Sequence, residues 1–122
     1  MILVDTSVWI DHLHRSEPLL IDALERGDVA THDLVIEELA LGSLASRASV
    51  IADLHNLVRC ATVSHDELLR FVDADTLWGR GLSVVDIHLL ASTLITPGGR
   101  LWTRDKRLRA AADDRGVAFS PE

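Results

Sequence analysis

Residues 1–10 read MILVDTSVWI, and this stretch indicates how the rest of the chain is arranged. Its apolar, partly β-branched run Ile2–Val4 is typical of a strand buried on both faces of a parallel sheet. Asp5 follows at once, and Thr6 or Ser7 can cap the helix predicted next. Asp5 thus lies at the carboxyl end of a predicted central strand, where ligands collect in open α/β sheets. The alternative is that Asp5 only helps to cap a helix.

Size and composition predict a single domain over residues 1–122 with its own hydrophobic core, since 48% of the residues are hydrophobic and 25% charged. No apolar run approaches the ~20 residues of a membrane span. The apolar N-terminus carries Asp5 and no basic lead-in, unlike a signal peptide. The single cysteine, Cys60, is interpreted as an inert core thiol. We therefore expect a cytoplasmic protein without membrane association.

The net charge of −7 argues at first against a nucleic-acid partner. Five of the twelve basic residues nevertheless lie in one short stretch: Arg100, Arg104, Lys106, Arg107 and Arg109. Such a run is usually a solvated helix face. It becomes a candidate phosphate contact if metal ions are held nearby.

Strand-like and helix-like segments alternate along the chain. The predicted strands are 2–4, 29–31, 58–63, 100–103 and 117–119, and the predicted helices begin near residues 8, 18, 34, 47, 65, 84 and 104. This alternation predicts right-handed crossovers and a parallel sheet covered on both faces. The fold class is therefore a three-layer α/β/α domain.

Two further aspartates stand at predicted helix starts. Leu101–Asp105 repeats the opening pattern of an apolar strand, a hydroxyl and an acid. The alternative is that Asp105 only stabilises the helix by interacting with its dipole, which is worth roughly 0.3–1 kcal/mol. Asp86 is the third helical residue of a capping-box sequence that begins at Ser83. Capping alone would explain Asp86. Its helix is, however, one of the most apolar in the chain, and a partly buried acid there needs a partner.

The helix predicted from residue 34 offers two glutamates. At about 100° per residue, Val35, Ile36 and Leu39 gather on one side of this helix. Glu38 borders that apolar side, whereas Glu37 points nearly opposite. Glu38 is therefore the acid expected to face a site, and Glu37 is expected to be solvated.

Four acids at one edge of a sheet would repel one another. Two unit charges 5 Å apart at an effective dielectric constant near 20 cost roughly 3 kcal/mol. Such a cluster persists only when protons or cations neutralise it, and oxygen ligands favour Mg²⁺ or Mn²⁺ over zinc. The six histidines do not change this, because none has a metal-pair spacing beside a cysteine, and they are expected at ordinary surface or partly buried positions.

Four segments carry a family resemblance: Val4–Val8, Ile36–Leu39, Val85–Ile87 and Thr103–Asp105. In this order, the chain resembles the PIN-domain ribonucleases, specifically the VapC-type toxins of bacterial toxin–antitoxin pairs. The resemblance implies a five-stranded parallel sheet of order 3-2-1-4-5. It also implies an acidic pocket of Asp5, Glu38, Asp86 and Asp105, supported by the Thr103 hydroxyl. A homodimer is implied too, silenced by a small VapB-like antitoxin whose tail fills the acidic groove.

The expected reaction is hydrolysis of an RNA phosphodiester with Mg²⁺, or Mn²⁺ in its place, activating water for in-line attack. Asp5 and Asp86 are expected to be the strongest metal ligands. Arg104, Lys106 and Arg107 become candidate phosphate contacts, because this run begins beside Asp105. Trp9 and Trp102 flank two strand ends; we expect them in the core, with base stacking as the alternative.

Two other functions compete with the nuclease. An Asp-nucleophile phosphatase of the haloacid-dehalogenase type would use Asp5, but it needs a second Asp two residues later, where this chain has Ser7. A non-catalytic interaction module could have kept the fold and lost the activity. The full set of four acids argues against that second alternative.

Overall fold

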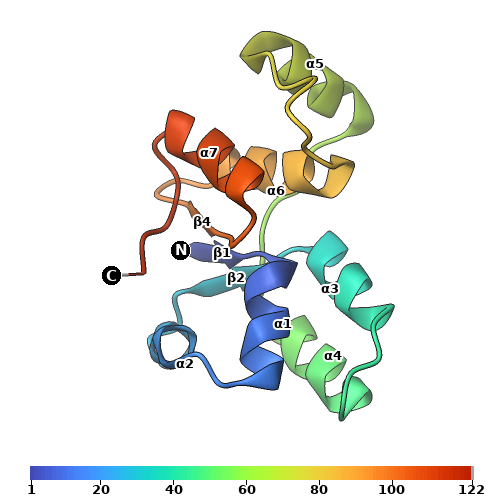
Figure 1. Ribbon diagram of the computed structural model, residues 1–122, viewed down its shortest axis with the longest axis vertical. Coiled ribbons are helices and arrows are strands. Elements are labelled where there is room, and N and C mark those ends of the chain that lie inside the picture. The colour runs from blue at the N-terminus through green and yellow to red at the C-terminus, as the bar shows by residue number, and fades with distance from the viewer. Residues whose placement is uncertain (122) are drawn as a thin grey trace.

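The computed structural model describes residues 1–121, which form four strands and seven helices (Figure 1). The strands are β1 (Ile2–Val4), β2 (Val29–Thr31), β3 (Val58–Arg59) and β4 (Arg100–Trp102). The helices are α1 (Thr6–His14), α2 (Pro18–Glu25), α3 (Asp33–Ala40), α4 (Arg47–His55), α5 (His65–Asp75), α6 (Val84–Ile95) and α7 (Lys106–Asp114). Strands and helices alternate as the sequence predicts.

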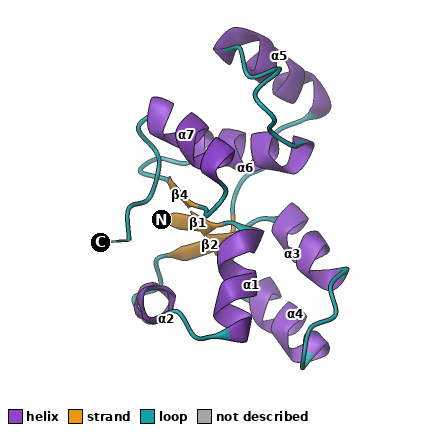
Figure 2. Ribbon diagram, in the orientation of Figure 1, coloured by secondary structure: helices purple, strands orange, loops and turns teal. Residues whose placement is uncertain are grey.

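All four strands are parallel and lie in the order β3-β2-β1-β4. Figure 2 shows β1 between β2 and β4. Leu3 pairs with Ala30 on one side and with Leu101 on the other. Every residue of β1 is buried, because helices cover both faces of the sheet. The predicted α/β fold and the order of these strands are therefore confirmed.

The predicted fifth strand, 117–119, is reduced to a single parallel bridge between Ala118 and Leu101. Leu101 N donates to Val117 O at 2.8 Å, and Phe119 N donates to Leu101 O at 2.9 Å. This segment lies at the expected place beside β4, but it forms only these two hydrogen bonds with β4 and is therefore too short to count as a strand. The third strand is likewise shorter than the predicted 58–63, since β3 ends at Arg59.

The helices divide into two layers around the sheet (Figure 1). Helices α1 to α4 lie on one side, whereas α6 and α7 lie on the other, with α5 beyond α6. With right-handed crossovers, this division follows from the strand order, because the chain runs from β1 through β2 to β3 and then returns to β4. The direction of winding changes between β1 and β4, and such a switch point opens a crevice at the carboxyl ends of the strands.

The core lies between the sheet and both helix layers. Trp9 and Trp102 are only 6% and 2% exposed, so both indoles belong to this core and neither offers a face for base stacking. Cys60 is buried as predicted. Within residues 1–121, no helix is long and apolar enough to cross a bilayer.

Candidate functional site

Asp5 lies directly after β1, and its carboxylate is almost fully buried, at 6% exposure for the residue. Its Oδ1 accepts a hydrogen bond from Thr6 N at 2.7 Å. Its Oδ2 accepts hydrogen bonds from Ser7 Oγ at 2.9 Å and from Thr103 Oγ1 at 2.7 Å. The predicted cap at Thr6 or Ser7 was wrong, because Asp5 itself is the N-cap of α1. Asp5 therefore both caps the helix and connects to the end of β4.

Asp105 occupies the corresponding position after β4, as the N-cap of α7. Its Oδ1 accepts hydrogen bonds from Arg107 N at 2.9 Å and from Leu108 N at 3.0 Å. Its own backbone N–H donates to Thr103 Oγ1 at 3.0 Å. The buried hydroxyl of Thr103 thus joins the Asp5 carboxylate to the backbone of Asp105.

Asp86 is the third member of the group and forms the predicted capping box at the start of α6. Ser83 N donates to Asp86 Oδ2 at 2.9 Å, and Asp86 N donates to Ser83 Oγ at 3.0 Å. Burial raises the pKa of Asp86 above its ordinary value, and the hydrogen bonds from Ser83 oppose this shift. The negative charges of Asp105 and Asp5 raise the pKa further. The three carboxylates are therefore close enough to interact electrostatically.

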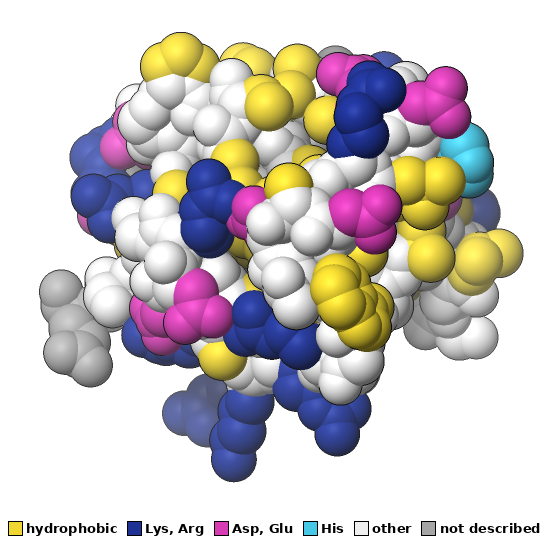
Figure 3. All heavy atoms as spheres, turned by 90° about the horizontal axis from the view of Figure 1, so that it is seen from above, with side chains coloured by type: hydrophobic (Ala, Val, Ile, Leu, Met, Phe, Trp, Pro, Cys, Tyr) yellow, Lys and Arg dark blue, Asp and Glu magenta, His cyan; other side chains and the backbone are white. Residues whose placement is uncertain are grey.

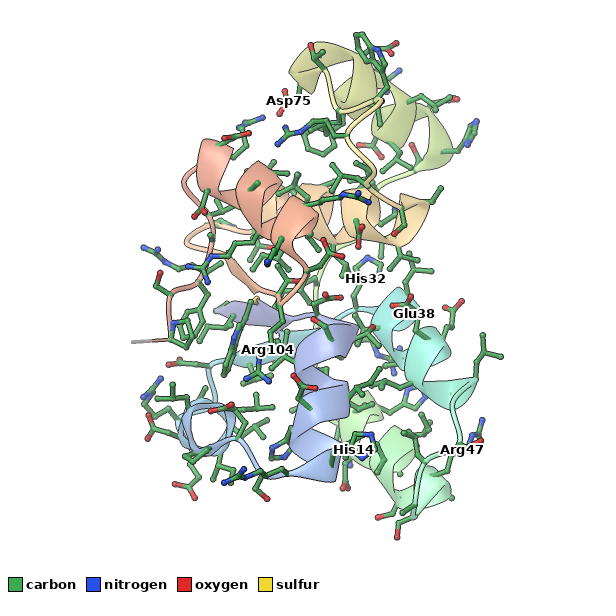
Figure 4. The ribbon with its side chains drawn as sticks, viewed as in Figure 1. His14, His32, Glu38, Arg47, Asp75 and Arg104 are labelled. Carbon is green, nitrogen blue, oxygen red and sulfur yellow. The ribbon has the colours of Figure 1, made fainter. Side chains whose placement is uncertain are left out.

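Glu38 approaches the same edge of the sheet from α3 (Figure 4). Its Oε1 accepts a hydrogen bond from Thr6 Oγ1 at 2.6 Å, so Glu38 is attached to the residue next to Asp5. Glu37 is exposed and its side chain forms no hydrogen bond or ion pair with residues 1–121. Both glutamates are exposed, and the difference between them is that Glu38 bonds Thr6, beside Asp5. The role of Glu38 in the site stays a prediction.

Three helix N-termini meet at this site, because α1, α6 and α7 all begin there. Asp5 and Asp105 are the N-caps of α1 and α7 and accept from the first backbone N–H groups of those helices, whereas Asp86, in the first turn of α6, accepts from the N–H of the cap residue Ser83. The positive end of each helix dipole favours the charge of its aspartate. Asp86 Oδ1 and Asp105 Oδ2 accept no hydrogen bond from residues 1–121. The caps thus hold one oxygen of each of these two carboxylates and leave the other unpaired.

The profile of the PIN domain matches residues 2–114. The chain belongs to the PIN-domain family. Two proteins named Ribonuclease VapC32, from Mycobacterium tuberculosis strains CDC 1551 / Oshkosh and ATCC 25618 / H37Rv, are each 52% identical to it over 122 residues. The match covers 100% of this chain and 98% of each relative.

Among solved structures, this PIN domain is similar to PAE2754 from Pyrobaculum aerophilum. The TM-score is 0.58 at 20% sequence identity, over 97% of this chain and 87% of that one. This likeness supports the fold alone. The PIN-domain match and the full-length match to the two VapC32 ribonucleases confirm the resemblance to VapC-type PIN ribonucleases.

Oxygen ligands of the PIN domain fit a hard divalent cation better than a soft one. The unpaired oxygens of Asp86 and Asp105 are of this kind. Burial raises the pKa of Asp86, the charges of Asp105 and Asp5 raise it further, and a cation would neutralise that negative charge. Among residues 1–121, however, no three His, Cys, Asp or Glu side chains already stand together as a metal site.

The basic run beside Asp105 divides into paired and unpaired side chains. The Arg104 guanidinium forms ion pairs with Asp11 and with Glu17, the latter at 2.6 Å (Figure 4). These hydrogen bonds raise the pKa of Arg104. Arg107, in contrast, forms no ion pair with a carboxylate of residues 1–121. Of these two predicted phosphate contacts, Arg107 is therefore the better candidate, because its charge is not neutralised by a carboxylate of residues 1–121.

His32 lies deeper than the sequence predicted, because only 2% of it is exposed (Figure 4). Its Nδ1 accepts a hydrogen bond from Leu34 N at 3.0 Å and so caps α3, the helix that carries Glu38. Burial lowers the pKa of His32, and the neighbouring His88, with ring centroids 6.4 Å apart, lowers it further. No sequence signal distinguished this histidine from the other five.

Replacing Asp86 with Asn is expected to stabilise the metal-free PIN domain at neutral pH. A carboxyl whose folded pKa is raised stabilises the fold below its unfolded pKa, about 3.9, and this contribution is lost as pH rises through the folded value. Asn keeps the oxygen that accepts from Ser83 N. Thermal melting in EDTA should therefore show a higher Tm for Asp86→Asn at pH 7 and equal values below pH 3.5. A difference that persists at low pH would contradict this electrostatic cause.

Proposed function

We propose that this PIN domain is a magnesium-dependent endoribonuclease whose metal is held by Asp5, Glu38, Asp86 and Asp105, with Mn²⁺ able to replace Mg²⁺. The chain is a VapC-type PIN ribonuclease by its family and its full-length relatives. The observation that supports the proposed site most directly is the Thr103 hydroxyl, which donates to Asp5 Oδ2 and accepts from Asp105 N. Burial raises the pKa of Asp86, and the charges of Asp105 and Asp5 add to this shift.

The divalent ion is expected to supply an activated water and to stabilise the leaving oxygen during attack on the RNA phosphodiester. Ribonucleases of this family generally depend on a divalent metal, and the choice of Mg²⁺ is part of the proposal. Asp86 and Asp105 would offer the oxygens that their caps leave unpaired. Asp5 would hold the metal from the floor of the site, where its surroundings fix its position.

The neighbouring hydroxyls orient the acids. Thr103 and Ser7 both donate to Asp5 Oδ2, so this carboxylate cannot rotate without losing two hydrogen bonds. Thr6 holds Glu38 Oε1 in the same way, which leaves Oε2 to direct a water toward the phosphate. Such preorganisation lets the charges of the site act without first rearranging.

VapC toxins act on RNA and pair with VapB antitoxins, and we extend both properties to this chain. Its substrate would be RNA in the cytoplasm, and its inhibitor a small VapB-like protein whose tail enters the acidic groove. The net charge of −7 suits a basic tail of this kind. We also keep the predicted homodimer and the single domain over residues 1–122 as parts of the proposal.

The two competing functions have less support. In the phosphatase alternative, the second Asp would stand at position 7, but Ser7 donates its hydroxyl to Asp5 Oδ2 instead. In the non-catalytic alternative, the acids would have no function beyond capping. Asp86 lies where the charges of Asp5 and Asp105 oppose its own, which a purely structural cap does not require.

Glu38→Gln is expected to reduce RNA cleavage by roughly 10- to 100-fold, because a neutral amide holds water and metal less strongly than a carboxylate. Glu37→Gln is the matched control on the same helix and should cleave like the wild type. Initial rates of RNA cleavage with excess Mg²⁺ and with EDTA would measure both variants. Equal losses in the two variants would remove Glu38 from the proposed site.

A further inference from the structure

The chain has three tryptophans, and only Trp78 is exposed, at 62%. It stands in the segment 76–83, which connects α5 to α6 and ends at Ser83, the cap of the helix that carries Asp86. Leu77, immediately before it, is buried. A large aromatic face is therefore presented to solvent by the segment that leads into the candidate site.

Contacts with α7 fix this segment at two points. The Arg80 guanidinium pairs with Asp114 at 3.0 Å, near the end of α7. At the beginning of α7, the Arg107 side chain lies against Gly81, where an added β-carbon would be 2.8 Å from Arg107 Nη1 and 3.0 Å from its Cδ and Cζ. Gly81 also has a φ of +74°, which disfavours other residues. An indole on such a fixed segment loses little conformational entropy when it binds a ligand.

Arg107 places a cation in the same region. Its backbone N–H donates to Asp105 Oδ1, so the residue begins beside the acidic site, while its side chain reaches the segment that carries Trp78. It forms no ion pair with a carboxylate of residues 1–121. Figure 3, viewed from the α5 end, shows Lys and Arg side chains interspersed with hydrophobic and acidic ones.

We propose that Trp78 stacks on a base of single-stranded RNA while Arg107 binds a phosphate of the same strand, so that both residues hold the substrate beside the acidic site. This inference rests on the proposed ribonuclease function. Single-stranded RNA is commonly bound by an aromatic face for the base and a cation for the backbone. The exposed indole of Trp78 and the guanidinium of Arg107, which lies against Gly81 in the same segment, supply these two groups.

A second protein is the competing occupant, because Leu69 on α5 and Val84 on α6 are also exposed. An apolar protein contact would leave the Arg107 charge without a partner, whereas an RNA phosphate supplies one. The experiment must therefore distinguish an aromatic requirement from a merely hydrophobic one.

The test compares Trp78→Leu with Trp78→Phe, since leucine keeps a hydrophobic side chain and phenylalanine keeps an aromatic ring. Binding to a randomised 20-nucleotide single-stranded RNA would be measured by fluorescence anisotropy in Mg²⁺. All variants would carry Asp5→Asn to prevent turnover, or, if that background folds poorly, Glu38→Gln to slow it. We expect Kd to rise about tenfold for Trp78→Leu and no more than about threefold for Trp78→Phe. Ile95→Ala, an exposed hydrophobic change at the far end of α6, should leave Kd unchanged.

Two further measurements support or overturn the proposal. RNA should quench the emission of Trp78, which is distinguishable because Trp9 and Trp102 are buried. Arg107→Gln should reduce the slope of log K against log salt by about 0.7. Unchanged Kd for Trp78→Leu, or equal losses for leucine and phenylalanine, would overturn the stacking contact. A third result would also overturn it: Trp78→Leu keeps its RNA binding but changes its oligomeric state, as measured by light scattering. The exposed surface around Trp78 would then be a contact for another protein.

Failure of this proposal is separable from failure of the proposed function. Binding is scored without turnover, whereas the nuclease proposal depends on metal-dependent cleavage by the wild-type chain. Cleavage that requires Mg²⁺ together with unaltered binding by Trp78→Leu would leave the nuclease proposal standing. RNA binding that depends on Trp78, without any cleavage by the wild-type chain, would support the RNA contact and contradict the nuclease proposal.

Discussion

Asp5→Asn is expected to abolish RNA cleavage while the domain remains folded. Loss of a metal ion that stabilises the transition state by several kcal/mol corresponds to a reduction of roughly a thousandfold or more. Asn keeps an oxygen for Thr6 N and places an NH₂ group against the hydroxyls of Ser7 and Thr103. Removing one charge from the acidic site offsets this poorer hydrogen bonding, so the metal-free variant should be as stable as the wild type or slightly more so. RNA cleavage with and without Mg²⁺, and thermal melting in EDTA, measure the two effects.

Asp66→Asn is the matched control for this substitution, because Asp66 is an exposed residue of α5. It should cleave RNA at the wild-type rate. If Asp5→Asn cleaves as well as the wild type, or fails to fold, Asp5 serves only as the cap of α1. The phosphatase alternative has a test of its own, since hydrolysis of small phosphomonoesters by the wild type would support that activity.

Thr103→Val is expected to be the most damaging change that removes no charge. Valine has the shape of threonine, but it leaves Asp5 Oδ2 with one donor fewer and the Asp105 N–H without its acceptor. Each lost buried hydrogen bond of this kind costs about 1–3 kcal/mol. We expect a fall in Tm of about 5 °C or more, and a 10- to 100-fold loss of cleavage because Asp5 is no longer held in place.

Thr103→Ser separates the hydroxyl from the methyl group. Serine retains both hydrogen bonds and should recover most of the cleavage rate, with a smaller loss of Tm from the missing methyl. If serine and valine variants have equal cleavage rates, the hydroxyl has no positioning function. Mg²⁺ titration of both variants would show whether the lost activity follows weaker metal dependence.

The arrangement of the acids was predictable because they stand at boundaries between elements. An apolar strand followed by an acid marks Asp5 and Asp105, and a capping-box sequence marks Asp86. Parallel strands place all such boundaries at one edge of the sheet. The choice of Glu38 over Glu37 followed from helical phase alone. These inferences needed only local patterns and the handedness of crossovers.

Contacts between distant segments were not predictable in the same way. Nothing in the sequence indicated that Thr6 holds Glu38, or that Arg107 lies against Gly81. Trp78 was overlooked because exposure depends on what packs around a residue, and the two tryptophans considered for stacking proved to be buried. The last predicted strand forms only one bridge, since strand-like composition does not determine how far a ladder extends.

The two N-cap aspartates, Asp5 and Asp105, constrain how this protein could lose its activity during evolution. An alanine at either helix start would cost about 0.5–2 kcal/mol, a noticeable share of the ~5–15 kcal/mol that stabilises a typical domain. Descendants that abandon RNA cleavage should therefore accept Asn, Ser or Thr at positions 5 and 105 more readily than alanine. Relatives that have lost the activity would still have polar residues at these helix starts, inherited from the ancestral enzyme.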